Sequence, residues 1–367
     1  MKMKIQKTTL QAVFSEISRF RGKGIMQHIH LSVSEKDGLT FRATDGEVTY
    51  VKKVALSNGE DVIVEIITPG ELLLPPKLEE VTRKLSSGMM SVTLLDTNQI
   101  EVKQGKTSAK INGVDGELPG IPEHVKGDGI TLTTEVLTML VTQTAFSASD
   151  KDGRPILKAV NMQSDETSFR VTSTDSHRLS QKTIPKPLKL PTLNIPAKRL
   201  AEVVNTLEEK QQLSLIPAGN HILIQTSDRE VYIRQLEGEY PNTSRLIQCN
   251  ASLKVKVNRQ ELLASINRSL TFAKDEQYRS ITLEPQESAL RIYSASDESG
   301  SIEETLEAAI DGEPVKFTIN ALFVSDALKA FTTEEVTLHI QSNEKPIFIF
   351  SEKDPTLTQL VLPIRTA

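Results

Sequence analysis

The sequence predicts an α+β fold made of three tandem repeats, each containing a helix, several strands, a second helix and several more strands. The first observation is a short motif that occurs as FRATDGEV, FRVTSTDSHRL and LRIYSASDESG. Its aspartates are Asp45, Asp175 and Asp297, which lie 130 and 122 residues apart. Recurrence at a nearly constant interval is the signature of repeated structural units, so these motifs predict three copies of one unit.

The second observation is a helical segment downstream of each motif, which begins at Leu73, Ile195 and Ile319. Its apolar residues have helical spacing in all three copies. They are Leu78, Val81 and Leu85, then Leu200, Val203 and Leu207, then Val324, Ala327 and Phe331. Pro196 and Asn320 suit the start of a helix.

The third observation is the end of each repeat, where GELP, GEYP and LVLP finish at Pro119, Pro241 and Pro363. An amphipathic helix is predicted near each repeat start, in TTLQAVFSEI, TTEVLTMLV and NRQELLASI. Thr8 with Gln11 and Asn258 with Glu261 match the capping-box pattern. Each helix is followed by a three-residue pattern: a basic residue, then a small residue or proline, then isoleucine. The three copies are Lys23-Gly24-Ile25, Arg154-Pro155-Ile156 and Arg279-Ser280-Ile281. Alternating stretches between the helices predict half-buried strands.

The length of 367 residues exceeds what one hydrophobic core usually supports. Together with the repeat, it predicts three domains, at residues 1–125, 126–249 and 250–367. Hydrophobic residues are 38% of the chain and charged residues 25%, which is typical of a folded globular protein.

Residue types argue against several classes of site. The single Cys249 allows no internal disulfide and no cysteine-based zinc cluster. The start, MKMKIQKTTLQ, lacks the apolar segment of a signal peptide, and no apolar run is long enough to span a bilayer. We therefore expect a cytoplasmic protein with no membrane partner, cofactor or metal. The net charge of −5 argues against a surface that attracts nucleic acid everywhere, but it is compatible with a local basic surface.

The stretch TDSHRL places Asp175, Ser176 and His177 side by side and raises the question of a catalytic group. Consecutive strand residues point to opposite faces, so these three cannot hydrogen-bond in series as a catalytic triad does. The chain also has no G-x-S-x-G elbow, phosphate-binding loop or H-E-x-x-H motif. We expect no enzyme.

The aspartate of this motif has a structural explanation, because a turn aspartate can bond its own backbone. Asp45, Asp175 and Asp297 are predicted to shape the same hairpin turn. Only the middle repeat continues with His-Arg-Leu, so a function confined to one repeat is expected there.

His28 and His30 could share one face of a strand and bind a metal. No other ligand cluster accompanies them in the sequence, so we favour two histidines on a partly exposed strand.

The repeat, RPIL with TDSHRL in the middle repeat, GEYP followed by Arg245, and the C-terminal LVLPIRT together resemble the bacterial sliding clamps, the beta subunits of DNA polymerase III. The resemblance covers the whole chain. It implies a processivity factor that encircles duplex DNA and tethers other proteins to it. The implied partners are a second copy in a homodimer, double-stranded DNA without sequence preference, a clamp loader, the replicative DNA polymerase and other proteins with clamp-binding motifs.

The resemblance implies a head-to-tail ring dimer with helices inside and sheets outside. The sequence supports closure between the first and third repeats, because KQGKTSAK is basic and SDESGSIEE is acidic. The alternative is two solvated charge runs. The residues assigned to the dimer interface are Lys103, Lys106, Lys110, Ile111, Leu270, Phe272, Asp297, Glu298, Glu303 and Glu304.

A clamp needs diffuse positive charge toward phosphates and no contacts that read bases. The helices and adjoining loops of the repeats provide candidates, although each alone is compatible with an ordinary solvated charge. The candidate DNA-facing residues are Arg19, Arg21, Lys23, Lys77, Arg83, Lys84, Lys151, Arg154, Lys198, Arg199, Arg259, Arg268 and Lys329.

The resemblance also implies a groove between the second and third domains that binds a short, largely apolar peptide ending in Leu or Phe. Apolar side chains would hold the anchor, with Arg and His bonding the peptide backbone. For Leu179 and Leu360 we also consider an ordinary core role. The residues carried over to this groove are Leu157, Thr174, Ser176, His177, Arg178, Leu179, Pro241, Arg245, Leu246, Asn320, Phe323, Pro346, Leu360, Leu362, Pro363 and Arg365.

The chain departs from the family pattern in several places. GKGIMQHIH replaces an apolar segment with proline, LLLPPKLEE has an uncommon double proline, Phe323 stands where Tyr is frequent, and Glu344 adds an acid at the groove rim. These departures would suit a second clamp copy. Two other function classes stay open, a tandem-repeat protein-binding scaffold that does not encircle DNA and a hydrolase that uses His177.

Overall fold

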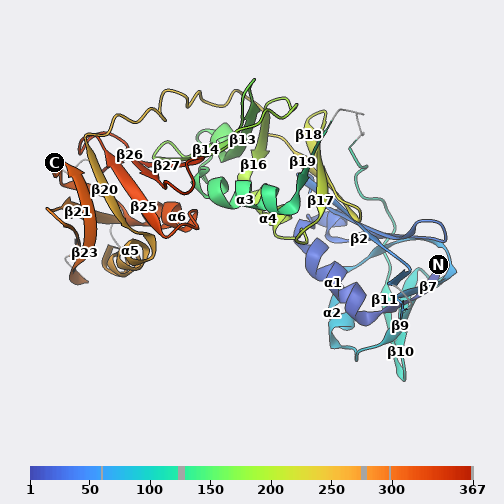
Figure 1. Cartoon of the computed structure of the whole chain (residues 1–367). Coiled ribbons are helices and arrows are strands. Elements are labelled where there is room, and N and C mark those ends of the chain that lie inside the picture. The colour runs from blue at the N-terminus through green and yellow to red at the C-terminus, as the bar shows by residue number, and fades with distance from the viewer. Residues whose placement is uncertain (59–60, 123–128, 274–278, 297–298, 365–367) are drawn as a thin grey trace. The chain divides into compact units, whose positions relative to one another are not determined.

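The computed structural model describes residues 1–58, 61–122, 129–273, 279–296 and 299–364. The chain forms two compact units, each built from two segments (Figure 1). The first unit contains residues 1–134 and 206–235, and the second contains residues 135–205 and 236–367. Each unit thus holds one outer repeat and part of the middle repeat.

The first unit contains helices α1 (Lys7–Ile17) and α2 (Pro76–Lys84) and two antiparallel sheets. The strands of one sheet, in spatial order, are β11 (Thr107–Asn112), β10 (Gln99–Gln104), β9 (Met89–Leu94), β1 (Lys2–Gln6) and β7 (Val64–Thr68). Those of the other are β12 (Ile130–Thr133), β17 (Gln212–Ala218), β18 (His221–Gln225), β19 (Arg229–Arg234), β4 (Val48–Val54), β3 (Gly38–Thr44), β2 (Ile29–Ser34) and β8 (Gly70–Leu74). A separate hairpin pairs β5 (Ser57–Asn58) with β6 (Asp61–Val62).

The second unit contains helices α4 (Ala197–Val204), α5 (Arg259–Ala273) and α6 (Ala321–Lys329), and α3 (Thr134–Thr144) enters it from the first unit. Its strands, in spatial order, are β16 (Leu193–Pro196), β13 (Ala159–Ser164), β14 (Phe169–Thr174), β15 (Arg178–Ile184), β27 (Leu357–Val361), β26 (Ile347–Phe350), β25 (Glu335–Ile340), β20 (Leu253–Asn258), β23 (Gly300–Gly312), β22 (Ala289–Ser296), β21 (Ser280–Pro285) and β24 (Phe317–Asn320). Figure 1 shows α3 and α4 on one side of the strands β13 and β16.

The predicted α+β repeat is confirmed, with one addition that sequence patterns missed. Each repeat opens with a strand, β1, β12 or β20, that runs directly into its first helix. These strands have four to six residues, so their alternation merges with the helical pattern that follows. Short 3-10 turns follow the first helices, including η2 (Gly24–Gln27) and η4 (Pro155–Lys158), whereas Ser280 in the third repeat begins a strand.

The helix caps were predicted correctly at two positions and wrongly at one. The carboxamide oxygen of Asn258 accepts from the N–H groups of Gln260 and Glu261, and Asn320 caps α6 in the same way. The capping box of Thr8 with Gln11 is wrong. Helix α1 begins at Lys7 because it continues from β1, so Thr8 lies inside the helix and has no cap role.

Most of the apolar positions predicted for the second helices are buried, namely Leu78, Leu200, Val203, Val324, Ala327 and Phe331. Val81, Leu85 and Leu207 are only partly buried. Among the described residues, no helix has both the length and the apolar character needed to cross a membrane.

Two strand pairings join the middle repeat to its neighbours, and both lie inside a compact unit. In the first junction, β4 pairs with β19, and Val48 stands opposite Ile233. In the second junction, β15 pairs with β27, and Arg178 stands opposite Val361. Val48 and Arg178 each lie three residues after the motif aspartate, so the two junctions have the same register.

Candidate peptide groove and strand junctions

The TDSHRL stretch forms the turn between β14 and β15. One carboxylate oxygen of Asp175 accepts from the N–H groups of His177 (2.9 Å) and Arg178 (3.0 Å), and Ser176 has a φ of 78°. Our premise that these residues lie in a strand is therefore wrong. The triad geometry still fails, because the Asp175 carboxylate is used by this turn and by the guanidinium of Arg178.

Asp45 makes the same turn in the first repeat, where it accepts from the N–H groups of Glu47 (2.9 Å) and Val48 (2.8 Å). The turn role is thus confirmed for Asp45 and Asp175. Asp297 lies outside the described residues.

Arg178 is held from several sides. Its Nε donates to Asp175 at 3.0 Å, and its Nη1 donates to Asp326 of α6 at 2.9 Å. The guanidinium carbon lies 4.4 Å from the centre of the Phe323 ring, a cation–π contact, and the side chain is 13% exposed. Arg178 therefore ties the turn to α6, and its predicted bonding to a peptide backbone would have to compete with two carboxylates.

Leu179 and Leu360 stand opposite each other in the second junction and form a buried cluster with Phe348. Ile247 and Cys249 pack against this cluster from the segment that leads to the third repeat. The core role considered for Leu179 and Leu360 is confirmed by their burial, and a groove role for them stays a prediction.

The other predicted groove residues divide into buried and exposed sets. Leu157 and Thr174 are buried, whereas Leu246 is 53% and Leu362 36% exposed. The backbone N–H of Leu362 donates to the carbonyl of His177 at 2.8 Å, which brings these two residues together. Exposed or partly exposed members are Ser176, His177, Pro241, Arg245, Asn320, Phe323, Pro346 and Pro363, while Arg365 lies outside the described residues.

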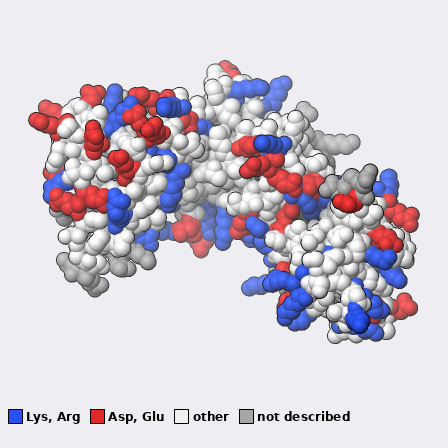
Figure 2. All heavy atoms as spheres, turned by 60° about the horizontal axis from the view of Figure 1, so that its bottom comes forward, with Lys and Arg blue, Asp and Glu red and all other residues white. Residues whose placement is uncertain are grey.

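The candidate DNA-facing residues often have acidic neighbours. Ion pairs are formed by Arg21 and Arg83 with Glu79, Lys77 with Glu80, Arg199 with Glu202, Arg268 with Glu304 and Lys329 with Asp326. Burial lowers the pKa of Arg21 while Glu79 opposes this effect, and its side chain is only 12% exposed. Figure 2 shows acidic and basic side chains interspersed over the face in view. The DNA-facing assignment stays a prediction.

The predicted dimer residues lie at two strand edges. Lys103, Lys106 and Lys110 are exposed on or beside β10 and β11, while Ile111 is already buried within its own unit. On β23, Glu303 pairs with Arg291 and Glu304 pairs with Arg268 of α5. Leu270 and Phe272 are partly buried on α5, and Glu298 lies outside the described residues.

Each junction carries a largely buried lysine and aspartate pair that sequence reasoning missed. Lys52 Nζ lies 2.6 Å from Asp228 in the first junction, and Lys182 Nζ lies 2.7 Å from Asp354 in the second. Both lysines lie seven residues after the motif aspartate, a spacing that could have identified them. Burial raises the pKa of Asp354, but hydrogen bonds from Lys182 and Thr356 outweigh it, so the pKa is lowered overall.

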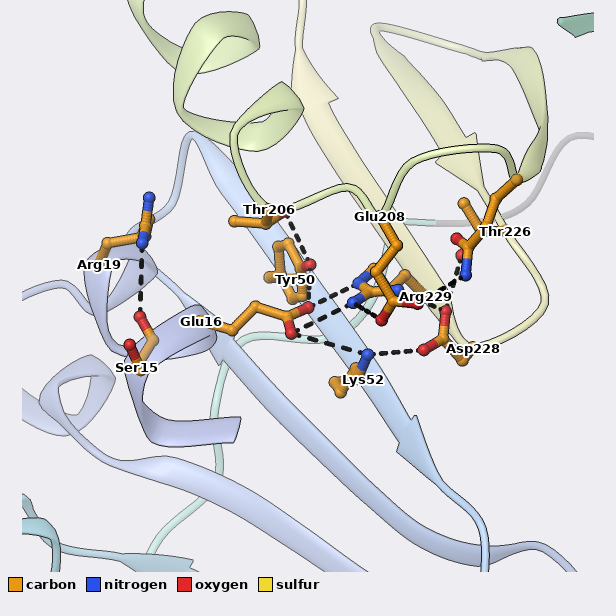
Figure 3. Close-up of polar contacts among 11 residues, drawn as sticks. Ser15, Glu16, Arg19, Tyr50, Lys52, Thr206, Glu208, Thr226, Asp228 and Arg229 are labelled. Atoms are coloured by element: carbon orange, nitrogen blue, oxygen red, sulfur yellow. Dashed lines mark hydrogen bonds and ion pairs between the residues drawn. The ribbon is translucent and has the colours of Figure 1, made fainter. Parts of the chain in front are cut away.

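The first junction also contains a network of charged side chains around Arg229 (Figure 3). Arg229 is 3% exposed and bonds Glu16 of α1 at 2.6 Å, Glu208 at 2.9 Å and Asp228 at 2.7 Å. The hydroxyl of Tyr50 donates to Glu16 at 2.5 Å. Burial works against the charge of Arg229, but its hydrogen bonds to Glu16 and Glu208 outweigh this effect and raise its pKa.

The two histidines considered as metal ligands make different contacts. His28 is buried just before β2, with Nδ1 3.0 Å from the carbonyl of Ile25, so its predicted position on the strand is wrong. His30 lies on β2 beside Glu71. No group of three or more His, Cys, Asp or Glu side chains within the described part of the chain is arranged to hold a metal.

Known protein families share this architecture. The family models for the DNA polymerase III beta subunit match residues 131–242 as its central domain and residues 244–365 as its C-terminal domain. The beta sliding clamp of Staphylococcus aureus is 30% identical over 326 residues, covering 87% of this chain and 85% of the relative. The chain belongs to the beta sliding clamp family.

Two further relatives extend the similarity to the full length. The beta sliding clamp of Bacillus subtilis is 29% identical over all of both chains. A crystal structure of the DNA polymerase sliding clamp from Bacillus subtilis superposes with a TM-score of 0.93 at 27% identity, over 100% of both chains. The predicted family, fold class and function as a DNA sliding clamp are therefore confirmed, and the scaffold alternative is not favoured. The domain boundaries and the distinction between a main clamp and a second copy stay predictions.

Proposed function

We propose that the chain closes into a head-to-tail homodimeric ring around duplex DNA. The observation that carries this proposal concerns β23, the strand that follows the third motif. Unlike β4 and β15, it pairs with no strand of another repeat in the described part of the chain. Residues Gly300–Glu307 of β23 pair with β22, and no strand in the described part of the chain pairs with their other side. Strand β11 is likewise an edge strand of its sheet. A second copy would join these two edges as β4 joins β19.

The register of this third junction follows from the other two. Gly300 lies three residues after Asp297, as Val48 lies three after Asp45. Ile111 lies four residues after the first residue of β11, as Ile233 lies four after Arg229. Gly300 would therefore stand opposite Ile111, and Glu304 opposite Thr107.

In this register, an acidic residue would occupy the position of the junction lysine and a basic residue that of the junction aspartate, so the two charges are exchanged. Glu304 occupies the position of Lys52 and Lys182, and Lys106 occupies the position of Asp228, just before the last strand. The helix beneath is reversed too, since Arg268 bonds Glu304 where Glu16 lies near Lys52. Opposite charges at this contact would favour the first and third repeats as partners and disfavour pairing with the strands of the other junctions.

Sedimentation velocity tests the ring. We expect a dimer of twice 40.6 kDa. Glu304→Lys and Lys106→Glu should each weaken the dimer by about tenfold, and the double variant should recover part of the loss, because the new charge at position 304 still lies beside Arg268. Glu307→Lys, on the same strand but beyond the end of β11 in this register, is the control and should change little. A monomer in the wild type at micromolar concentration would contradict the proposal.

We further propose that the ring holds DNA without reading its sequence, using basic residues of the repeat helices, and that the clamp itself catalyses no reaction. Retention on nicked circular DNA in the presence of a clamp loader, with release when the circle is linearised, tests this role. Release that does not depend on linearisation would favour a scaffold that never encircles DNA.

Finally, we propose that partner proteins, the replicative polymerase among them, dock an apolar peptide beside His177 and Leu362. The exposed apolar side chains of Leu246 and Leu362 support this site. Leu362→Ala with Pro363→Ala should abolish binding of a clamp-binding peptide and leave the dimer intact, and unchanged affinity would contradict it.

A further inference from the structure

One carboxylate of the first repeat, that of Glu79, bonds three side chains where the two helices of the repeat meet. Glu79 lies in the first turn of α2. Its Oε2 accepts hydrogen bonds from Ser18 Oγ at 2.9 Å and from Arg21 Nη1 at 2.8 Å, both in the segment that follows α1. Its Oε1 accepts from Arg83 Nη2 at 2.9 Å. Glu79 therefore holds two of the arginines that are predicted to face DNA.

These two arginines differ in their access to solvent. The side chain of Arg21 is 12% exposed and that of Glu79 18%, whereas that of Arg83 is 69% exposed. The Nε and Nη2 atoms of Arg21 are buried and have no hydrogen-bond acceptor within the described residues. Arg21 and Ser18 therefore fix the carboxylate from its buried side, and Arg83 is the arginine that a ligand in solution can reach.

The surface around this carboxylate gives Arg83 room to move. A hollow of about 420 Å³ lies between the two helices, lined by side chains of α1 and of the turn after it, and by Glu79 and Arg83. In the described part of the chain, Glu79 is the one hydrogen-bond partner of the Arg83 side chain. The position of Arg83 therefore depends on this single contact.

The other two repeats have no acid at this position. Glu79 lies five residues after Leu74, the last residue of β8. The residues five after the ends of β16 and β24 are Ala201 and Ser325. Ser325 carries no charge and donates to Asn267 of α5. A carboxylate at this helix contact is therefore a property of the first repeat alone.

A phosphate that binds Arg83 has to replace the Glu79 carboxylate, since both are acceptors for the same guanidinium. DNA affinity depends on the number of phosphates that cations of the protein neutralise, so an arginine that is already paired adds little to it. We propose that Glu79 is a positioning residue that keeps Arg83 from DNA phosphates and so weakens the hold of the first repeat on duplex DNA. The inference rests on the proposed function, in which basic residues of the repeat helices hold DNA.

Anisotropy of a short fluorescent duplex, onto which the ring can thread from either end, tests the inference at several salt concentrations. Glu79→Gln isolates Arg83, because the amide oxygen can still accept from Ser18 and Arg21, while the amide nitrogen turned toward Arg83 is a donor and cannot bond it. We expect this variant to bind about threefold more tightly and to steepen the slope of log K against log salt by about one, the value for one further phosphate contact. Adding Arg83→Gln to it should remove both changes.

Glu80→Gln is the matched control, because it removes the same charge from the same helix. Glu80 bonds Lys77 in a pair whose side chains are 55% and 66% exposed, so Lys77 already reaches solvent and the slope should change much less. Equal effects of Glu79→Gln and Glu80→Gln would show that only net charge matters and would overturn the inference. A gain that survives Arg83→Gln would overturn it as well.

Arg83→Gln alone tests the same contact without altering its buried side. In the wild-type background it should flatten the slope only slightly. A loss of about one would mean that Arg83 contacts phosphate while Glu79 is in place, and the inference would then be wrong. Retention of the wild type on nicked circular DNA is measured in parallel, and its absence would overturn the proposed function together with this inference. Retention combined with any of the contrary results above would overturn the inference alone.

Discussion

The first and second junctions share a register and a lysine and aspartate pair. The side chains around that pair are charged in the first junction and neutral in the second. The first junction adds Glu16, Glu208 and Arg229, so it is ionic on its helix side. At the second junction, Gln359 Nε2 donates to the carbonyl of Gln143 at 3.0 Å, and Ser180 Oγ donates to the side-chain oxygen of Gln359. The repeat thus determines the strand pairing and one ion pair, and the remaining contacts are free to differ.

The two junctions differ on the other face as well. Thr49 and Tyr232 stand opposite each other in the first junction, where the second has Leu179 and Leu360. The apolar pair forms a buried cluster with Phe348 in the second junction, whereas Tyr232 of the first junction lies in a buried cluster with Ala218 and Leu223. This difference is one way in which the proposed peptide site would be confined to a single junction.

The largest expected effect is at the first junction. Arg229→Met would remove the cation that Glu16, Glu208 and Asp228 share and leave Lys52 as the cation near Glu16 and Asp228, so stability should fall by about 3–5 kcal/mol. Urea unfolding of the dimer measures the shift in the midpoint. Arg234→Met, which removes an exposed arginine from the same strand, is the control. Equal effects of the two variants would show that the network contributes no stability.

The shared ion pair should matter equally in both junctions. Lys52→Met and Lys182→Met each leave an aspartate without its main hydrogen-bond donor, and each should cost about 1.5–3 kcal/mol. The same urea experiment compares them. A much larger loss for Lys52→Met would mean that the pair depends on the ionic network around it, and the equivalence of the two junctions would then be wrong.

A smaller loss is expected from the neutral network of the second junction. Gln359→Leu removes hydrogen bonds to Ser180 and to the carbonyl of Gln143 but leaves no charge unpaired, so the cost should be about 1–2 kcal/mol. Gln341→Leu changes an exposed glutamine and serves as the control. A loss as large as that of Arg229→Met would contradict the contrast between the junctions.

The smallest expected effect is the acid response of the shared pairs. The pKa values of Asp228 and Asp354 are both lowered, in each case because hydrogen bonds and positive charge outweigh burial. A lowered folded-state pKa gives stability that is present above the ordinary Asp value of about 3.9 and is lost as the pH falls below it. Asp228→Asn and Asp354→Asn should each flatten the fall in urea midpoint below pH 4. An unchanged slope in both would contradict the assignment.

Much of the candidate site could be predicted from sequence because its key residues repeat or break the repeat. Asp175 was identified as a turn residue since the same residue recurs at Asp45, and His177 was set apart since it does not recur. The Arg229 network could not be predicted, because Glu16 and Arg229 are 213 residues apart and meet only when β19 pairs with β4.

By itself, the sequence determined the number of repeats, the two helices of each repeat, and the turn that begins the junction strands β4 and β15. These features depend on local spacing, which a linear pattern records. Only the tertiary structure decided that each compact unit takes part of the middle repeat, and that Arg178 is committed to Asp175 and Asp326. Those outcomes depend on which distant strands pair and which charges burial then brings together, and no local pattern encodes them.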